Sequence, residues 1–183
     1  QCVFIDHRRS SEEMVAHLLA LGHTRIAFVA GICGSPTGER RLRGYRDALR
    51  KAGISPDPNL VVRGAWSTES GYEAGRQLLA QRSPFTCVLA ANDDMAIGLA
   101  KAFQEAGKTL PGDISLAGFD DSVIGKYFTP SLTTMHVPMD DMIRDAVEIL
   151  LNPNEERVFS HLGTLVNRDS VARRVDGVNE LTS

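Results

Sequence analysis

Hydrogen-bonding and aromatic side chains gather directly after the apolar runs of this sequence, where the strands of a sheet would end. They supply carboxylate, guanidinium, amide and hydroxyl groups and the single indole ring of the chain. In an open parallel sheet, ligands bind at the carboxyl ends of the strands, so these groups are expected to share one edge. The five clusters are Asp6, the loop at 31–41, Trp66, Asn92 with Asp93, and Asp120 with Asp121.

The types of group suit a polyol or a similarly polar small molecule. A carboxylate such as Asp120 can accept hydrogen bonds from two neighbouring hydroxyls, and Arg41 can donate a fork of them. Asn92 offers both a donor and an acceptor, and Trp66 can cover the apolar face of a sugar ring. The same ring could stack on a purine, so Trp66 favours a sugar only mildly. One aromatic wall with a few directed polar groups is typical of a small-ligand pocket.

Each of these residues also has a purely structural interpretation. Asn92 and Asp93 open a predicted helix, where Asn and Asp often act only as N-caps. Asp120 could be a solvated loop carboxylate, and the basic run 40–43 that contains Arg41 is typical of a solvated helix face. The indole could simply cover apolar surface. The ligand-site interpretation gains weight because all of these groups follow successive strands.

The elements that must position these groups alternate along the chain. Ile26–Ala30 is unbroken apolar, as in a strand buried on both faces. Ser10 and Glu13 have capping-box spacing and predict a helix beginning near Ser11. Strand alternating with helix predicts an α/β fold with a parallel sheet. Strands are expected at 3–5, 26–30, 60–62, 87–91, 114–119 and 133–137, helix ends at Gly22, Gly53 and Gly107, a helix at 139–151 and extended chain at 157–168.

Composition excludes several classes of protein. The 183 residues are 43% hydrophobic and 23% charged, which is ordinary for a globular domain. A formal net charge of −3 argues against a surface that itself grips nucleic acid. No apolar run approaches the roughly 18 residues that cross a bilayer, and residues 1–9 do not form a signal peptide.

The cysteine and histidine spacings predict no structural metal, and nothing in the sequence indicates a cofactor. The three cysteines, Cys2, Cys33 and Cys87, are odd in number and widely spaced. They are expected to be reduced thiols in a cytoplasmic protein, with Cys87 buried in a strand.

Enzyme motifs are absent from the sequence. Gly107-Lys108-Thr109 resembles the end of a phosphate-binding loop, but Ala102 stands where that loop needs a glycine. No nucleophile elbow or dinucleotide fingerprint occurs. A hydrolase using Asp120 and Asp121 as acid and base is disfavoured, because adjacent loop residues rarely face one substrate together. The chain is therefore predicted not to be an enzyme.

An ordered series of motifs resembles the effector-binding core of lac repressor-type bacterial transcription regulators. The resemblance covers roughly residues 13 to 170, and the ordered set is far more specific than any one motif. Its parts are Leu21-Gly22-His23 with Arg25-Ile26-Ala27-Phe28, Arg41-Leu42-Arg43-Gly44-Tyr45, Trp66 to Tyr72, Ala91 to Gly98, Asp113-Ile114-Ser115 through Gly118-Phe119-Asp120-Asp121, and Pro130 to Thr134.

The resemblance implies a periplasmic-binding-protein-like fold of two α/β lobes around an effector cleft. It implies a homodimer in which effector binding changes lobe closure and thereby the fit of paired helix-turn-helix heads to operator DNA. By position, the effector-contacting residues would be Asp6, Thr37, Arg41, Trp66, Asn92 and Asp120, with Arg41 and Asp120 as the leading pair. The subunit contacts would include Ile97, Tyr127 and Phe128.

The sequence departs from the family pattern because it contains neither the helix-turn-helix head nor most of the first lobe. The connection between Asp6 and the first helix is also nearly absent. The expected division is residues 1–9 as the end of the first lobe, 10–138 as the second lobe, 139–157 as a helix returning to the first lobe, and 158–183 as a final strand region with a tail.

Two functions remain open at this point. The leading one is a cytoplasmic regulator, expected to be a repressor, whose core binds a small metabolite, expected to be a sugar. The alternative is a periplasmic sugar-binding receptor of a transport system, which would share the fold. The stretch Asn92–Gly98 and the three free cysteines favour the regulator.

Overall fold

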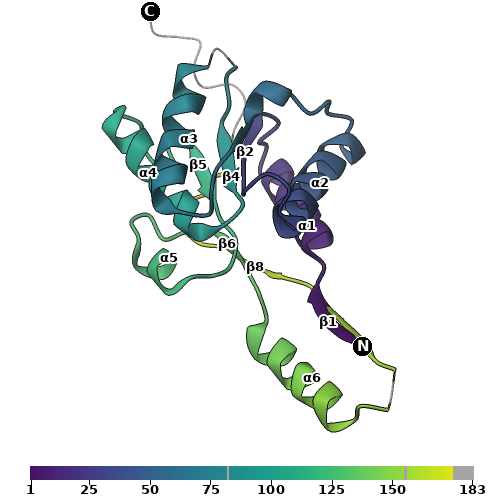
Figure 1. Cartoon of the computed structure of the whole chain (residues 1–183). Helices are drawn as coiled ribbons and strands as arrows, with labels where there is room; N and C mark the ends of the chain where they lie inside the picture. Colours follow the sequence, from purple (N-terminus) through teal and green to yellow (C-terminus); the bar gives the residue numbers. More distant parts are fainter. Residues whose placement is uncertain (82, 155, 175–183) are drawn as a thin grey trace, which may run out of the picture.

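The computed structural model describes residues 1–81, 83–154 and 156–174. Its main sheet has four parallel strands in the order β3-β2-β4-β5 (Figure 1). The inner strands are apolar and buried along their whole length, as expected of strands covered on both faces. The predicted parallel α/β architecture is confirmed. The strands are β2 (Ile26–Ala30), β3 (Val61–Arg63), β4 (Cys87–Ala90) and β5 (Ser115–Ala117).

Two pairs of helices cover the two faces of this sheet (Figure 1). Helices α1 (His7–Ala20) and α2 (Pro36–Lys51) lie together on one face, and α3 (Thr68–Ala80) and α4 (Asp93–Glu105) lie together on the other. Their apolar sides form one core with the strands, in which the Phe28 and Tyr45 rings stack 5.0 Å apart. Cys87 lies in this core, and burial raises the pKa of its thiol.

The predicted helix ends are confirmed at Gly22, Gly53 and Gly107. Each of these glycines lies just after a helix, and their φ values are 92°, 74° and 73°, respectively. This is the left-handed conformation that ends a helix and favours glycine. Cys87 also lies in a strand as expected. The strand predicted at 60–62 is displaced by one residue, because Pro58–Leu60 forms a 3-10 turn, η1, before β3 begins.

The predicted capping box at the first helix is wrong. Helix α1 begins at His7, and its N-cap is Asp6, whose carboxylate accepts a hydrogen bond from the Arg9 amide at 3.0 Å. Ser10 is buried inside the first turn, where its hydroxyl donates to the Asp6 carbonyl at 2.8 Å and accepts from the Gly163 amide at 2.8 Å. The helix runs directly off the preceding strand, so Ser10 cannot act as a cap.

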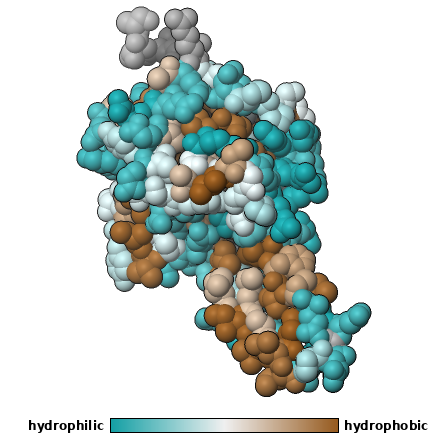
Figure 2. All heavy atoms as spheres, in the orientation of Figure 1, coloured by the Kyte–Doolittle hydropathy of each residue, from teal (hydrophilic) through white to brown (hydrophobic). Residues whose placement is uncertain are grey.

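A small unit projects from this lobe (Figure 1). Strand β1 (Cys2–Ile5) pairs in parallel with β7 (Val158–His161), and α6 (Met139–Leu151) packs along them. The Asp145 carboxylate and the His161 ring nitrogen lie 2.7 Å apart and join the helix to β7. The predicted helix at 139–151 and extended chain beyond it are confirmed. Figure 2 shows an apolar surface on α6, whose exposed members are Met139, Ile143, Val147, Leu150 and Leu151.

Three short connections join the small unit to the main lobe. Asp6 alone separates β1 from α1, residues 137–138 separate β6 (Thr134–His136) from α6, and residues 162–163 separate β7 from β8 (Thr164–Val166). Strands β6 and β8 pair antiparallel beneath the main sheet, and an isolated bridge from Ala117 to Thr133 joins them to β5. The short helix α5 (Val123–Tyr127) lies between β5 and β6.

Candidate functional site

Arg41 is the centre of the polar cluster at the carboxyl edge of the main sheet. Its side chain is only 4% exposed, and its guanidinium donates to the Asp120 carboxylate at 3.0 Å and to the Ala91 carbonyl. The same group lies 3.6 Å from the centre of the Phe119 ring, a cation–π contact that is strengthened by burial. A buried guanidinium with these partners holds one fixed orientation.

The local sequence explains why α2 delivers Arg41 to this place. Ser35 caps the helix by accepting a hydrogen bond from the Gly38 amide, and Pro36 occupies the first helical position. Leu42, Tyr45 and Leu49 form the buried face of the helix. Arg41 lies on the margin of that face, so its chain is packed while its head reaches the ends of β4 and β5.

Trp66 forms an aromatic wall beside the guanidinium. The ring centre lies 5.9 Å from Arg41 Cζ, and a Cβ built on Gly31 would lie 2.1 Å from the ring. The indole can therefore occupy this position only because residue 31 is a glycine. The backbone of Trp66 is left-handed, with a φ of 67°, which is uncommon for a bulky side chain and persists only when the surroundings enforce it.

Asn92 fastens this wall to α4. Its side-chain carbonyl accepts a hydrogen bond from the Met95 amide at 3.0 Å, which is the N-cap interaction of the helix. Its amide nitrogen donates to the Trp66 backbone carbonyl at 3.0 Å. The side chain is buried, and its oxygen and nitrogen both form hydrogen bonds within the protein. In this structure Asn92 therefore positions Trp66.

Asp120 supplies the carboxylate that faces Arg41. Its side chain remains 45% exposed, and its backbone is left-handed with a φ of 109°. Partial burial raises the pKa of the Asp120 carboxyl, and the Arg41 guanidinium opposes that rise. The free edge of this carboxylate is the part that a ligand hydroxyl could reach.

Thr37 and Asp6 come from the starts of α2 and α1, respectively. Thr37 is half-buried in the first turn of α2, one helical turn before Arg41 on the same side of the helix. The Asp6 carboxylate serves as the N-cap of α1. Their expected contact with an effector stays a prediction, as does that of Asn92.

Sequence reasoning missed two members of the cluster, His7 and Phe119. The His7 ring accepts a hydrogen bond from Arg41 Nε at 3.4 Å, and its centre lies 6.1 Å from that of Phe119. Both residues adjoin selected ones, since His7 follows Asp6 and Phe119 precedes Asp120. Burial, together with the Arg41 and Arg40 guanidiniums, lowers the pKa of His7 to about 4.

Acid should destabilise the chain partly through His7. The folded-state pKa of His7 lies near 4 and the unfolded value near 6.5, so the unfolded state takes up the proton first. This residue's contribution to stability is complete above pH 6.5 and declines as the pH falls toward 4. Between pH 7 and 5, these two pKa values correspond to a loss of about 2 kcal/mol, which solvent screening of the partly exposed ring reduces to about 1 kcal/mol. The free energy of unfolding should therefore fall by about 1 kcal/mol more in the wild type than in His7→Gln, measured by urea unfolding. Equal losses in the two proteins would contradict this.

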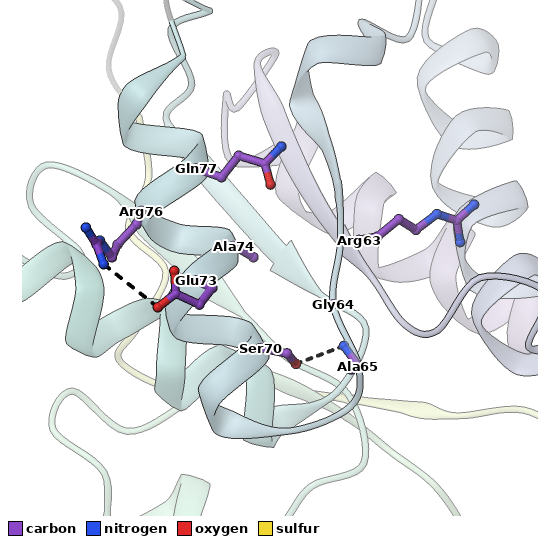
Figure 3. A pocket seen from close by; sticks show the side chains of 8 residues that line it. All are labelled: Arg63, Gly64, Ala65, Ser70, Glu73, Ala74, Arg76 and Gln77. Carbon is purple, nitrogen blue, oxygen red and sulfur yellow. Dashed lines mark hydrogen bonds and ion pairs between the residues drawn. The ribbon is translucent and has the colours of Figure 1, made fainter.

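The groove in Figure 3 is a different feature from the Arg41 cluster. It lies between edge strand β3 and helix α3, with Arg63, Gly64, Ser70, Arg76 and Gln77 among its lining residues. Its arginines are already paired, Arg63 with Glu39 at 2.8 Å and Arg76 with Glu73 at 3.8 Å. It shares no lining residue with the cluster.

Two of the residues expected at a subunit contact, Tyr127 and Phe128, lie at the end of the exposed apolar helix α5. Tyr127 is 83% exposed at the end of α5, and Val123 and Ile124 of the same helix are also exposed. Ile97 on α4 and Phe128 are half-buried. Their role in a dimer stays a prediction.

Within residues 1–81, 83–154 and 156–174, no helix has the length and hydropathy of a membrane span. The same ranges hold no group of three or more acidic, His or Cys side chains placed to bind a metal.

Comparison with known sequences places the chain among bacterial regulators. The profile of the periplasmic binding protein-like domain family matches residues 15–171. The transcriptional regulator AscG of Escherichia coli is 39% identical over 173 residues, which span 92% of this chain and 52% of AscG. GalR of the same organism is 36% identical over 179 residues, or 94% of this chain and 52% of GalR. The chain thus spans about half the length of the curated relatives it matches.

Solved structures of LacI-family regulators have the same fold as this chain. A sugar-binding LacI-family regulator from Escherichia coli in complex with phosphate has a TM-score of 0.88 at 38% identity, over 94% of this chain and 63% of that one. A CelR–cellobiose complex gives 0.84 at 31% identity, over 92% and 53%. A LacI-family regulator from Enterococcus faecium with bound ribose gives 0.84 at 29% identity, over 94% and 66%.

Proposed function

Because this chain belongs to the LacI/GalR family of transcriptional regulators, of whose effector-binding domain it forms part, we propose that it binds a sugar at the Arg41 cluster. The observation that carries the proposal is the convergence of a fixed guanidinium, a half-exposed carboxylate and an indole at one sheet edge. Asp120 would accept hydrogen bonds from ligand hydroxyls, Arg41 would orient it, and Trp66 would cover an apolar ring face.

Two of the matched structures support a sugar as the class of ligand, since they contain cellobiose and ribose. The site itself favours a neutral polyol. Arg41 already has a carboxylate partner in Asp120, so an anionic ligand would have to compete with that ion pair. A hydroxyl can instead share the Asp120 oxygens without breaking it.

We propose that the whole protein lies in the cytoplasm and that a ligand controls its binding to operator DNA allosterically. A sugar that binds one lobe arrangement better than another shifts the population toward it, and that shift would change how paired helix-turn-helix heads sit on the operator. The protein would act as a homodimeric repressor, with Ile97, Tyr127 and Phe128 at the subunit contact. The exposed apolar residues of α5 support such a contact.

In the full-length protein, Asp120→Ala should weaken sugar binding by about 2–3 kcal/mol, the scale of a lost hydrogen bond to a charged group. Calorimetric titration with cellobiose, ribose and a purine base measures the effect and the ligand class together. Glu13→Ala is the control, because it removes an exposed carboxylate from α1. Unchanged affinity in Asp120→Ala would show that Asp120 does not contact the ligand. Binding of the purine but of neither sugar would contradict the proposal that the ligand is a sugar.

The transport-receptor alternative is separated by the intact mass and N-terminal sequence of the native protein. A regulator should carry a basic helix-turn-helix segment ahead of the first lobe. A receptor should begin at a signal-peptide cleavage site and lack that segment. The second result would leave the ligand site in place and end the DNA-binding proposal.

A further inference from the structure

Within the described ranges, Asp93 is the only buried acidic residue, and 1% of its surface is exposed. It accepts a hydrogen bond from the Thr134 hydroxyl at 2.7 Å and another from the Ser122 amide at 2.7 Å. Its own backbone amide donates to the Phe119 carbonyl at 2.9 Å. One residue at the start of α4 therefore contacts both the turn that carries Asp120 and strand β6.

That turn needs an external support. Asp120 and Asp121 are both left-handed, with φ of 109° and 57°, a conformation that costs free energy in residues with a side chain. The turn also closes tightly on its support, since a Cβ at Gly118 would lie 2.1 Å from Asp93 Oδ1. Hydrogen bonds of backbone amides join the turn to β6, from the Asp120 amide to the Met135 carbonyl at 2.8 Å and from the Asp121 amide to the Thr134 hydroxyl at 3.3 Å. The Asp121 side chain is held separately, by Arg168 and His136.

We propose that Asp93 is a positioning residue of the effector site, a role that rests on the proposed function of the Arg41 cluster. Its carboxylate holds the turn so that Asp120 faces Arg41, and it locks the same turn to β6. Strand β6 leads through residues 137–138 into α6 of the small unit. Movement of the small unit is thereby coupled to the carboxylate that a ligand would contact.

Asn92 does the same for the other wall of the site. It ties the strained Trp66 backbone to α4, while Asp93 ties the strained Asp120 turn to the same helix start. Two consecutive side chains thus fix the indole and the carboxylate relative to each other.

Hydrogen–deuterium exchange of Asp93→Ala tests the positioning role without any ligand. The amides of Asp120, Asp121 and Ser122 are hydrogen-bonded to this junction, and they should exchange about tenfold faster or more once the carboxylate is removed. Amides of β2 and β4 should keep their wild-type rates. Thr134→Val is a milder second variant, which should accelerate exchange at Asp121 in particular.

Asp94→Ala is the matched control, because Asp94 is an exposed carboxylate in the same first turn of α4 and its removal changes the charge at the helix start equally. It should leave the three amides unchanged. Wild-type exchange in Asp93→Ala, equal acceleration in Asp94→Ala, or acceleration spread through the main sheet would each overturn the proposal.

The functional arm is titration of the full-length protein with cellobiose and with ribose. Asp93→Ala should weaken whichever sugar binds the wild type by about tenfold, and Asp94→Ala should not. Full affinity in Asp93→Ala would overturn the role. If neither sugar binds the wild type, the sugar proposal fails for these ligands, while the exchange experiment still decides the position of Asp120.

Discussion

Arg41→Ala is expected to lower the free energy of unfolding by about 3 kcal/mol and to weaken sugar binding by about 2–3 kcal/mol. The substitution removes a guanidinium that is 4% exposed and leaves the Ala91 carbonyl and one face of Phe119 without their partner. It also frees Asp120 from the group that orients it. Urea unfolding of the chain measures the first effect, and calorimetry with cellobiose and ribose measures the second.

Two further substitutions sharpen this result. Arg43→Ala removes an exposed arginine two residues along the same helix and should change neither quantity appreciably. Arg41→Lys keeps the charge without the fork of donors, so its losses should fall between those of wild type and alanine. An unfolding midpoint for Arg41→Ala equal to that of wild type would show that the cluster is not held through Arg41.

Gly98→Ala should destabilise the fold by about 3 kcal/mol, although alanine is the better helix former. Helices α3 and α4 cross in backbone contact at this point. A Cβ on Gly98 would lie 1.9 Å from the Thr68 carbonyl oxygen and 2.5 Å from the Tyr72 nitrogen, and one on Gly71 would lie 2.2 Å from the Met95 oxygen. The helices must move apart to accept it, and α4 carries Asn92 and Asp93 at its start.

Gln104→Ala is the matched control, because it also places alanine in α4 but at an exposed position. It should leave stability within about 0.5 kcal/mol of wild type. A gain in stability for Gly98→Ala, as at an open helical position, would contradict the close approach of the two helices.

The sequence is sufficient for the order and type of most elements, but not for the short helix α5 or for the division of 157–168 into β7 and β8. Unbroken apolar runs such as Ile26–Ala30 and glycines such as Gly53 are local signals, and the structure confirms the strand and the helix end that they predict. The spatial order β3-β2-β4-β5 is absent from any local signal, because it depends on how the crossover helices pack. The helix start near Ser11 was wrong since a capping-box spacing does not reveal that α1 continues directly from β1.

The site was only partly predictable for a similar reason. Arg41 and Asp120 are 79 residues apart in the sequence. Their meeting was predictable, because both come from connections that follow strands, and the carboxyl ends of parallel strands share one edge of the sheet. Phe119 looked like one more core residue of a buried strand, and its contact with a guanidinium exists only once α2 has docked. The left-handed backbone of Trp66 opposes the preference of its own side chain, so no propensity could have indicated it.

The three connections between the small unit and the main lobe, of one, two and two residues, have a kinematic consequence. A body tied to another at three closely spaced points by such short tethers loses translation and most of its rotations. The motion that remains is a limited rotation about these tethers. Substitutions anywhere in the two bodies can then alter the size of this rotation, but the short tethers keep the two bodies from separating.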